Sequence, residues 1–336
     1  MEKTKIRMLA GILAVAAVWG TFAVWNCVKP SDEYSLSERR KLAQRPEFSV
    51  GSVLSGEYMT AFDKAAPDQF PLREKFRTLK AVTGLYVLGK KDNNGIYIAD
   101  GYAAKTEYPL RDSSVDGAIE KITEYYENYC RDKANAVYFS IVPDKGYFLA
   151  PKNGYPHMDY EALAEKMSGS LSFAEYIDLY PTLSIEDYYK TDTHWSQDKI
   201  ISAADALSAA MGGEALHDYE IKKFDTPFYG VYYGQAALPM APDSLYYVDS
   251  DVLSCAKVEN VENARKYTGV WDEQKLESTD PYEVFLSGAA AIVYVENEKA
   301  ETDRELIMFR DSFGSSIAPL LLHNYKKITL VDTRYV

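Results

Sequence analysis

The sequence predicts an α/β domain, a largely parallel sheet with flanking helices, behind one N-terminal membrane anchor. Three observations support this fold class. Short apolar runs of the kind that form buried strands alternate with helical segments, and an uncharged stretch near the N-terminus is long enough to cross a bilayer. A tyrosine-rich region with few helical patterns, residues 214–288, interrupts the alternation and is expected to form a β-rich insertion.

The N-terminal segment carries the clearest physical signal. Lys3, Lys5 and Arg7 precede the run 8–28, which contains no charge and is dominated by Leu, Ala, Val, Ile and Trp. About 20 such residues span the hydrocarbon core of a bilayer, and basic residues ahead of the run hold that end in the cytoplasm. Because the run is longer than the apolar part of a usual signal peptide, we expect an uncleaved anchor rather than a cleaved signal.

Composition divides the chain into three segments. Residues 1–29 are predicted to be the membrane anchor or signal-anchor, and residues 30–47, a polar stretch of mixed charge, are predicted to be a linker. Residues 48–336 would then form the main domain outside the cytoplasm. With 47% hydrophobic residues in the chain, this length is ample for one large core.

Charge and cysteine content restrict the partners. The formal net charge of −13 disfavours nucleic acid as a partner, because a phosphate backbone needs a basic protein face. Outside the cytoplasm Cys130 and Cys255 could form a disulfide, although two free thiols fit the sequence equally well. No group of cysteines and histidines has metal-ligand spacing, so neither a metal nor another cofactor is expected.

Hydrophobic periodicity predicts the elements of the main domain. Helices are expected over 59–88, broken by prolines, and over 115–132, 161–169 and 197–211. Strands are expected over 95–97, 136–142, 173–179, 291–295, 306–309 and 327–331. The segment 173–179 has a comparable helix propensity. In a sheet of this kind the functional site lies at the carboxyl ends of the strands.

One serine falls where such a site would be. The apolar run 306–309 is followed by a helical segment, 315–323, and Ser312 lies between them at a predicted strand-to-helix turn. Free backbone N–H groups at a helix start, together with the positive end of the helix dipole, can stabilise an oxyanion formed beside a serine. The position of Ser312 therefore suits a nucleophile.

A base and its orienting partner are available far upstream. A serine hydroxyl is a weak nucleophile at neutral pH, so it needs a base, and the base needs a group that fixes its tautomer. Asp192 and His194 can supply both, because residues two apart on an extended segment point to the same side. A capped turn in which His194 has a structural role is the alternative interpretation of this spacing.

Longer sequence blocks surround these candidate residues. They read YYKTDTHWS at 188–196, FRDSFGSSIAPLL at 309–321 and KKITLVDTRYV at 326–336. Softer blocks lie at Asp68–Arg73, Asn94–Tyr102, Val142–Lys145 and Phe228–Gly230. In these blocks the chain resembles the DHHW family of bacterial extracytoplasmic proteins, which is similar to the periplasmic alginate O-acetyltransferases. The resemblance implies an SGNH-hydrolase-like, flavodoxin-like fold with its sequence blocks permuted.

The resemblance also implies roles for individual residues. It makes Ser312 the nucleophile, His194 the general base and Asp192 its orienting carboxylate. Arg310 is a departure, since the block that names SGNH enzymes has a glycine at that position.

Three further residues are candidates for substrate binding. Trp195 either packs behind the histidine or contacts a sugar directly, with packing the more favoured interpretation. Arg334 and Tyr335 match the end of the last family block, and an arginine near the site could bind a carboxylate or orient an acyl group.

We expect a serine-dependent O-acetyltransferase that acts on a cell-surface or exported polysaccharide. The resemblance implies a bacterial cell membrane location, with a single-pass anchor, and a membrane-bound O-acyltransferase as the partner that supplies acetyl groups. Two alternatives stay open: a carbohydrate acetylesterase that uses the same three residues, and a non-catalytic wall-binding or assembly protein on the same fold.

Overall fold

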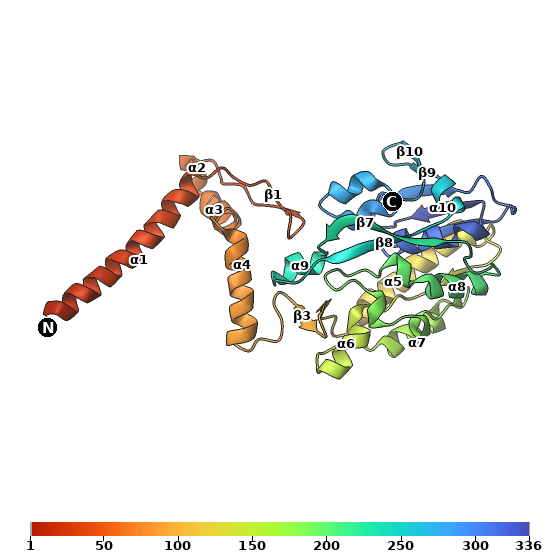
Figure 1. Ribbon diagram of the computed structural model, residues 1–336, viewed down its shortest axis with the longest axis horizontal. Helices are drawn as coiled ribbons and strands as arrows, with labels where there is room; N and C mark the ends of the chain where they lie inside the picture. The colour runs from red at the N-terminus through yellow and green to blue at the C-terminus, as the bar shows by residue number, and fades with distance from the viewer. Residues whose placement is uncertain (1, 336) are drawn as a thin grey trace. The chain divides into compact units, whose positions relative to one another are not determined.

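The computed structural model describes residues 2–335, with side chains from residue 4 onward, and Figure 1 shows its elements. The outermost residues of the predicted segments, 1 and 336, lie outside the described part. The chain divides into two compact units, the first running to Asn93 with Ala237–Pro239, the second comprising Asn94–Ala236 and Met240 onward. The predicted boundary at residue 48 falls inside the first unit, whose helices continue to Val82.

The first unit is mostly helical. Its helix α1 contains the segment Thr4–Val28, which is long and apolar enough to span a membrane or to serve as a signal sequence. A two-residue antiparallel ladder follows, and helix α4 is extended by a π-helical turn, Thr83–Val87. The elements are α1 Glu2–Val28, β1 Tyr34–Ser35, β2 Arg40–Lys41, α2 Val50–Leu54, α3 Glu57–Asp68 and α4 Arg73–Val82.

The predicted linker, 30–47, is a structured part of this unit. Both terminal nitrogens of Arg40 donate to the carboxylate of Asp68, at 2.8 and 2.6 Å, and Arg73 pairs with Glu38. The hydrogen bonds from Arg40 hold the pKa of Asp68 down to about 2, although partial burial opposes this shift. Polar contacts thus tie the segment to α3 and α4.

A five-stranded mixed sheet forms the centre of the second unit. Its strand order is β10-β9-β11-β13-β12, and all neighbours are antiparallel except the parallel pair β12 and β13. The strands are β9 Lys257–Asn260, β10 Arg265–Thr268, β11 Ile292–Glu296, β12 Glu305–Phe309 and β13 Lys327–Val331. The last three confirm the strands predicted there, but the sheet is not the largely parallel one that we expected.

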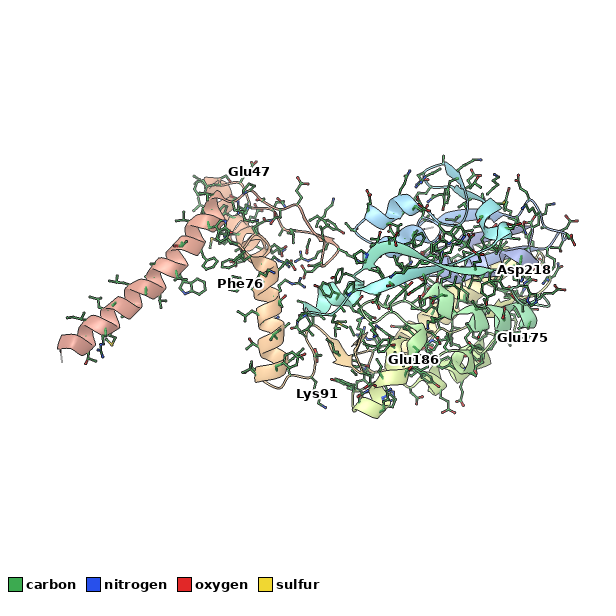
Figure 2. The ribbon with its side chains drawn as sticks, in the orientation of Figure 1. Glu47, Phe76, Lys91, Glu175, Glu186 and Asp218 are labelled. Atoms are coloured by element: carbon green, nitrogen blue, oxygen red, sulfur yellow. The ribbon has the colours of Figure 1, made fainter. Side chains whose placement is uncertain are left out.

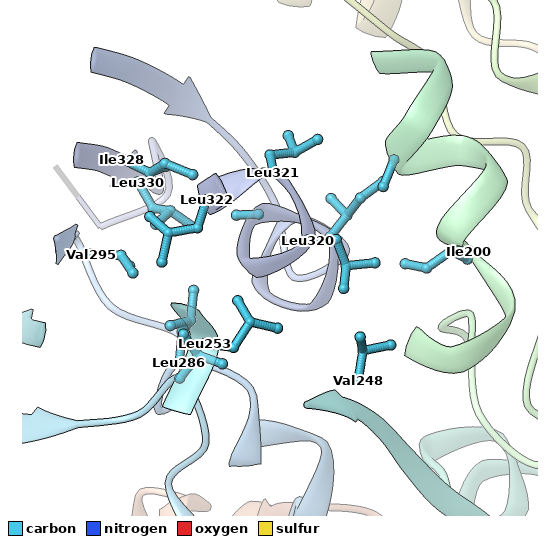
Figure 3. Close-up of a cluster of buried hydrophobic side chains, with 14 of the residues drawn as sticks. Ile200, Val248, Leu253, Leu286, Val295, Leu320, Leu321, Leu322, Ile328 and Leu330 are labelled. Carbon is cyan, nitrogen blue, oxygen red and sulfur yellow. The ribbon is translucent and has the colours of Figure 1, made fainter. Parts of the chain in front are cut away.

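Side-chain burial explains the difference. Along β11 and β13 buried and half-buried residues alternate, so that one face of each strand packs in the core. Helix α11 Gly314–Leu321 packs on that face, and α8 Ile201–Ala210 packs against α11. Figure 3 shows leucines of the α11 segment between the strand side chains and Ile200. Ile307 of the edge strand β12 is 61% exposed. Both faces of a doubly wound parallel sheet would instead be covered.

Short elements precede and surround this sheet. Helices α5 and α7 confirm the predicted helices in their regions, and β5 and β6 form only a short parallel pair within the predicted strands. All three cysteines of the described chain are free thiols. The elements are β3 Ile96–Ala99, β4 Tyr102–Lys105, α5 Asp112–Tyr125, β5 Tyr138–Phe139, α6 Lys145–Asn153, α7 Tyr160–Ser170 and β6 Glu175–Tyr176.

The predicted insertion, 214–288, is not a separate excursion. Its first part is an antiparallel hairpin of β7 Glu220–Phe228 and β8 Asp243–Asp249, with α9 Val231–Ala236 between the two strands. After the short helix α10, Asp251–Cys255, the chain enters β9 and β10, which extend the main sheet. The region therefore both completes the sheet and, through the hairpin, reaches the candidate site.

Candidate active site

Ser312 lies in the turn between β12 and α11, where the sequence predicts it. The turn is fixed at Asp311, whose carboxylate accepts from the N–H of Phe313 at 2.9 Å and whose carbonyl accepts from Gly314 at 3.1 Å. These helix-start N–H groups are thus engaged rather than free, which corrects our expectation. Within the described turn the N–H of Ser312 itself has no partner in the chain, so it is the donor available to an oxyanion.

Asp192 and His194 lie at the tip of a tight loop. Tyr188 and Trp195 form an antiparallel bridge across its base, and Tyr189 N–H donates to the carbonyl of His194 at 3.1 Å. The N–H of His194 donates to Asp192 Oδ1 at 3.0 Å, which is a local turn of the kind aspartate favours. The loop therefore presents the carboxylate and the imidazole on the same side.

The structure brings the three predicted catalytic residues together. His194 Nε2 lies 2.7 Å from Ser312 Oγ, and His194 Nδ1 lies 2.5 Å from Asp192 Oδ1. Asp192 is completely buried and His194 nearly so, whereas Ser312 is half-buried. A carboxylate, an imidazole and a hydroxyl are thus connected in the order that serine acyl transfer requires.

The second oxygen of Asp192 is held from α9. Its Oδ2 accepts from Val231 N–H at 2.7 Å, so neither carboxylate oxygen is left unpaired in the interior. The preceding residue, Gly230, lies directly against Asp192, and a Cβ at that position would be only 2.2 Å from the Asp192 Cβ. Glycine is therefore required for α9 to approach the carboxylate.

Two charged residues, Asp243 and Lys145, hold the backbone of this loop through hydrogen bonds. Asp243, at the start of β8, accepts from Lys190 N–H at 2.8 Å, from Thr191 N–H at 2.7 Å and from the Thr191 hydroxyl at 2.6 Å. Lys145 donates from Nζ to the carbonyl of Tyr189 at 2.9 Å and is only 2% exposed. The backbone of the loop therefore has hydrogen bonds from its N–H groups to Asp243 and from Lys145 to a carbonyl, all within the three residues before Asp192.

The buried ammonium of Lys145 interacts electrostatically with the carboxylate of Asp192. Burial lowers the pKa of Lys145 to about 7, and the negative charges of Asp192, Asp243 and Asp144 oppose this shift. The ammonium also lies 5.1 Å from the ring centroid of Tyr232. A cation here would favour the ionised form of Asp192.

An aromatic layer supports the imidazole. The ring of Tyr282 stacks on that of His194, with centroids 3.9 Å apart and planes within 7°, and Phe313 contacts the same imidazole at 4.9 Å. Burial raises the pKa of Tyr282 well above its usual value, and its hydroxyl lies 2.8 Å from Ser316 Oγ. Ser316 also accepts the indole N–H of Trp195 at 2.8 Å, which links the layer to α11.

The three predicted substrate-binding residues have different surroundings. Trp195 is 1% exposed and contacts Phe313 edge-on, so the structure shows it in a packing role, with almost no surface open for contact with a sugar. Arg334 donates from Nε and Nη2 to the carboxylate of Asp332, at 2.8 and 2.6 Å. Its guanidinium lies 5.6 Å from the ring centroid of Tyr335, and both residues are exposed beside the C-terminal strand.

Arg310, the departure from the SGNH block, packs against the turn that carries Ser312 and has a structural role there. Its stem lies against Gly314, where a Cβ would meet the Arg310 side chain at 2.6 Å, and its terminal nitrogens donate to the carbonyls of Asp311 and Gly288 at 3.3 and 3.2 Å. Asp332 lies 3.7 Å away. Burial lowers the pKa of Arg310, and the Asp332 charge opposes that shift. The guanidinium holds the turn without reaching Ser312.

Chemically, the arrangement can activate a hydroxyl for attack on an acyl group. His194 can accept the Ser312 proton while Asp192 fixes its tautomer and stabilises the imidazolium. Among the described residues no group of three or more histidine, cysteine, aspartate or glutamate side chains could hold a metal ion.

Comparisons with known proteins agree with this geometry at the level of family and fold. The DHHW family model matches residues 176–331, a stretch that contains Asp192, His194 and Ser312. A DHHW family protein from Eubacterium siraeum DSM 15702 has the same fold, with a TM-score of 0.60 at 20% identity, over 73% of this chain and 84% of that one. No curated protein matches this chain in sequence.

Two further solved proteins are similar to the chain. Bacillus cereus PatB1 with a sulfonyl adduct has a TM-score of 0.58 at 16% identity, over 72% of this chain and 86% of that one. The O-acetyltransferase domain of Pseudomonas putida AlgJ has a TM-score of 0.33 at 16% identity, over 48% and 67%, a likeness too distant to bear on function.

Sequence reasoning missed several residues that build the site. Lys145 and Gly230 stand in blocks that carry the family resemblance, but nothing in either block indicated a role beside Asp192. Asp243 and Tyr282 had no signal at all, because one is an ordinary aspartate and the other is one of 28 tyrosines.

Proposed function

We propose that the second unit is a serine-dependent acyltransferase that moves an acetyl group onto a hydroxyl of a cell-surface or exported polysaccharide. The observation that supports this most is the hydrogen-bonded series from Asp192 through His194 to Ser312, with the imidazole 2.7 Å from the hydroxyl. A general base must lie within hydrogen-bond reach of the hydroxyl that it activates, and His194 does.

In the proposed reaction Ser312 Oγ attacks the acetyl carbonyl of a donor ester while His194 Nε2 takes the hydroxyl proton. The N–H of Ser312 donates a hydrogen bond to the oxyanion that forms. Collapse expels the donor alcohol, which takes the proton from His194, and leaves an acetyl ester on Ser312. A sugar hydroxyl then attacks this ester, giving its proton to His194, and the acetylated sugar leaves as Ser312 recovers the proton.

The likeness to PatB1 supports the first half of this reaction. That protein carries a sulfonyl adduct, and a sulfonyl electrophile is the kind of reagent that traps an activated nucleophile. The adduct is an observation on PatB1, which is only 16% identical to this chain. That Ser312 would form a similar adduct is our proposal.

The location and partners belong to the same proposal. We place the second unit outside the cytoplasm, anchored by α1, because basic residues precede the apolar segment. An acetyl donor would then have to be supplied across the membrane, for which a membrane-bound O-acyltransferase is the proposed partner.

The decisive experiment asks for a covalent adduct on Ser312. The full chain, purified in detergent, is treated with a fluorophosphonate ester and examined by intact-mass and peptide mass spectrometry. We expect one adduct, mapped to Ser312, absent from Ser312→Ala and strongly slowed in His194→Ala. Ser315→Ala is the matched control, since Ser315 Oγ is buried in the adjoining helix α11 with no hydrogen-bond partner, and this variant should label normally.

No adduct on the folded, unaltered chain would reject the nucleophile and with it the transferase. If the adduct forms, incubation of the acetylated enzyme with bare and with acetylated polysaccharide separates transfer from hydrolysis. Mass gain on the bare polymer supports the transferase, whereas loss of acetyl groups from the modified polymer supports an acetylesterase.

A further inference from the structure

Helix α4 and the turn that continues it carry an apolar stripe that remains largely exposed in the first unit. Leu79 is 59% exposed, Tyr86 77% and Val87 74%, although large apolar side chains rarely stay open to water as a contiguous group. The stripe follows helical spacing along one side of the element. Its exposed apolar members are Leu72, Phe76, Leu79, Tyr86 and Val87, and the half-buried Thr83 lies between Leu79 and Tyr86.

The opposite side of α4 makes polar contacts within the first unit, so the stripe faces away from those contacts. Arg77 donates to the Ser37 hydroxyl at 3.0 Å and lies 3.2 Å from the carboxylate of Glu38, and Glu74 accepts from the same hydroxyl at 2.7 Å. These contacts bind the polar side of α4 to the segment before α2. The helix is therefore amphipathic, with only its apolar side available for a partner.

The stripe begins at the end of the apolar helix α1. The ring of Phe22 packs on Phe70 and Phe76, with centroids 5.5 and 5.7 Å apart, and Figure 2 shows Phe76 on the side of α4 nearest α1. Phe22 lies six residues before Val28, which is about 9 Å along the helix axis. Phe76 therefore sits at the depth of the last turns of α1, not beyond its end.

That depth has a consequence if α1 crosses a bilayer. The apolar segment has 25 residues and is about 37 Å long, whereas the hydrocarbon core is about 30 Å thick. The last turns of α1 then lie at the boundary between acyl chains and headgroups. A side chain that packs on Phe22 from outside, as Phe76 does, lies at that boundary too.

Lysines border the stripe as they do on helices that lie at a membrane surface. Lys75, Lys80 and Lys90 are all exposed beside it, and their long stems can reach headgroups while the neighbouring apolar side chains enter the acyl region. An open crevice of about 330 Å³ lies among these residues. It is lined by Phe76, Leu79, Lys80, Thr83, Gly84, Leu88, Lys90 and Asn93.

We propose that this stripe binds the surface of the bilayer that α1 crosses, so that α4 lies among the lipid headgroups as a second membrane contact. The occupant is lipid, because the stripe continues the apolar surface of α1 and carries a basic border that suits anionic headgroups. This inference is independent of the enzymatic proposal and depends only on α1 being inserted.

The test reads the environment of single positions in the full chain. A cysteine-free variant (Cys27→Ser, Cys130→Ser, Cys255→Ser) receives one cysteine, either at Leu79 in the stripe or at Glu74 on the polar side. Each is labelled with the environment-sensitive fluorophore NBD and reconstituted into vesicles of phosphatidylcholine and phosphatidylglycerol. A second set of vesicles contains lipids with a nitroxide on the acyl chain as quencher.

We expect the label at Leu79 to show blue-shifted emission and at least about twofold quenching by the nitroxide lipids, because the boundary region is within reach of the acyl chains. The label at Glu74 should show neither. Blue-shifted emission at Leu79 without quenching would mean that protein covers the stripe, either the second unit or another copy of the chain. Water-like emission at Leu79, or failure of the chain to float with the vesicles, would equally overturn the proposal.

Discussion

The ring of Tyr282 lies flat on the imidazole of His194, with centroids 3.9 Å apart and planes within 7°. Both rings are buried, and the tyrosine hydroxyl is held by Ser316 on α11, so the stack can fix the plane in which the imidazole lies. That plane determines whether Nε2 points at Ser312. The imidazole is thus oriented both through its nitrogens and through its face.

Replacing Tyr282 by Leu should slow labelling of Ser312 by a fluorophosphonate. The stacking interaction is worth about 1 kcal/mol. If that energy holds the imidazole in its reactive orientation, its loss corresponds to a roughly fivefold lower labelling rate. Tyr282→Phe keeps the ring and loses only the contact with Ser316, so its rate should stay close to that of the unaltered chain. The rates are compared by intact-mass spectrometry. Equal rates in both variants would mean that the stack has no part in orienting His194.

Gly230 gives a sharper prediction because there is no room beside Asp192. An added Cβ would approach the Asp192 Cβ to 2.2 Å, so Gly230→Ala must displace α9 or the triad loop. We expect a loss of about 1–3 kcal/mol in the free energy of unfolding and a strongly reduced labelling rate. Urea unfolding and adduct formation measure the two effects.

The matched control is Gly117→Ala. Gly117 lies inside α5 with no atom within 4 Å of an added Cβ, so alanine there should stabilise the chain by about 0.5–1 kcal/mol without changing the labelling rate. If Gly230→Ala behaved like the control, the close approach of α9 to the carboxylate would not matter for the site.

Local patterns explain why the main elements of the site could be predicted. Ser312 follows an apolar strand and precedes a helix within a short stretch of sequence, and the spacing of Asp192 and His194 puts both on the same side of one loop. Each of these relationships depends on neighbours in the chain, which periodicity and turn chemistry describe well.

The rest depends on contacts between distant segments. Tyr282 and Asp243 reach the site from elements with no distinctive pattern, so only the folded chain shows which tyrosine and which aspartate are used. The sheet was wrongly expected to be largely parallel because short apolar runs such as 291–295 look alike in both sheet types. The sequence also does not reveal ion pairs such as that of Arg40 with Asp68, which bind the segment predicted to be a linker.

Asp243 should be needed for the shape of the triad loop. Its two oxygens accept three hydrogen bonds from Lys190 and Thr191, and an asparagine amide nitrogen would oppose at least one of these donors. Asp243→Asn should therefore cost about 1.5–3 kcal/mol in the free energy of unfolding and slow the labelling of Ser312. Asp225→Asn, at an exposed position of the neighbouring strand β7, is the control and should change neither quantity. An Asp243→Asn chain as stable as the control would show that the loop keeps its shape without the carboxylate.

Lys145 predicts a pH dependence of stability with a definite sign. Its pKa is about 7 in the folded chain and about 10.4 when exposed, so between these values the unfolded chain binds a proton that the folded chain does not. The free energy of unfolding then rises with pH through this window, by about 1 kcal/mol per pH unit from this group, and the contribution is flat below it.

The variant Lys145→Met lacks this titrating group. Urea unfolding, followed by tryptophan fluorescence to which the buried Trp195 contributes, should therefore show the unaltered chain gaining stability relative to Lys145→Met as the pH rises from about 7 to 9. Parallel curves for the two chains would mean that the ammonium keeps its ordinary pKa and that its charge does not report on the carboxylates of the site.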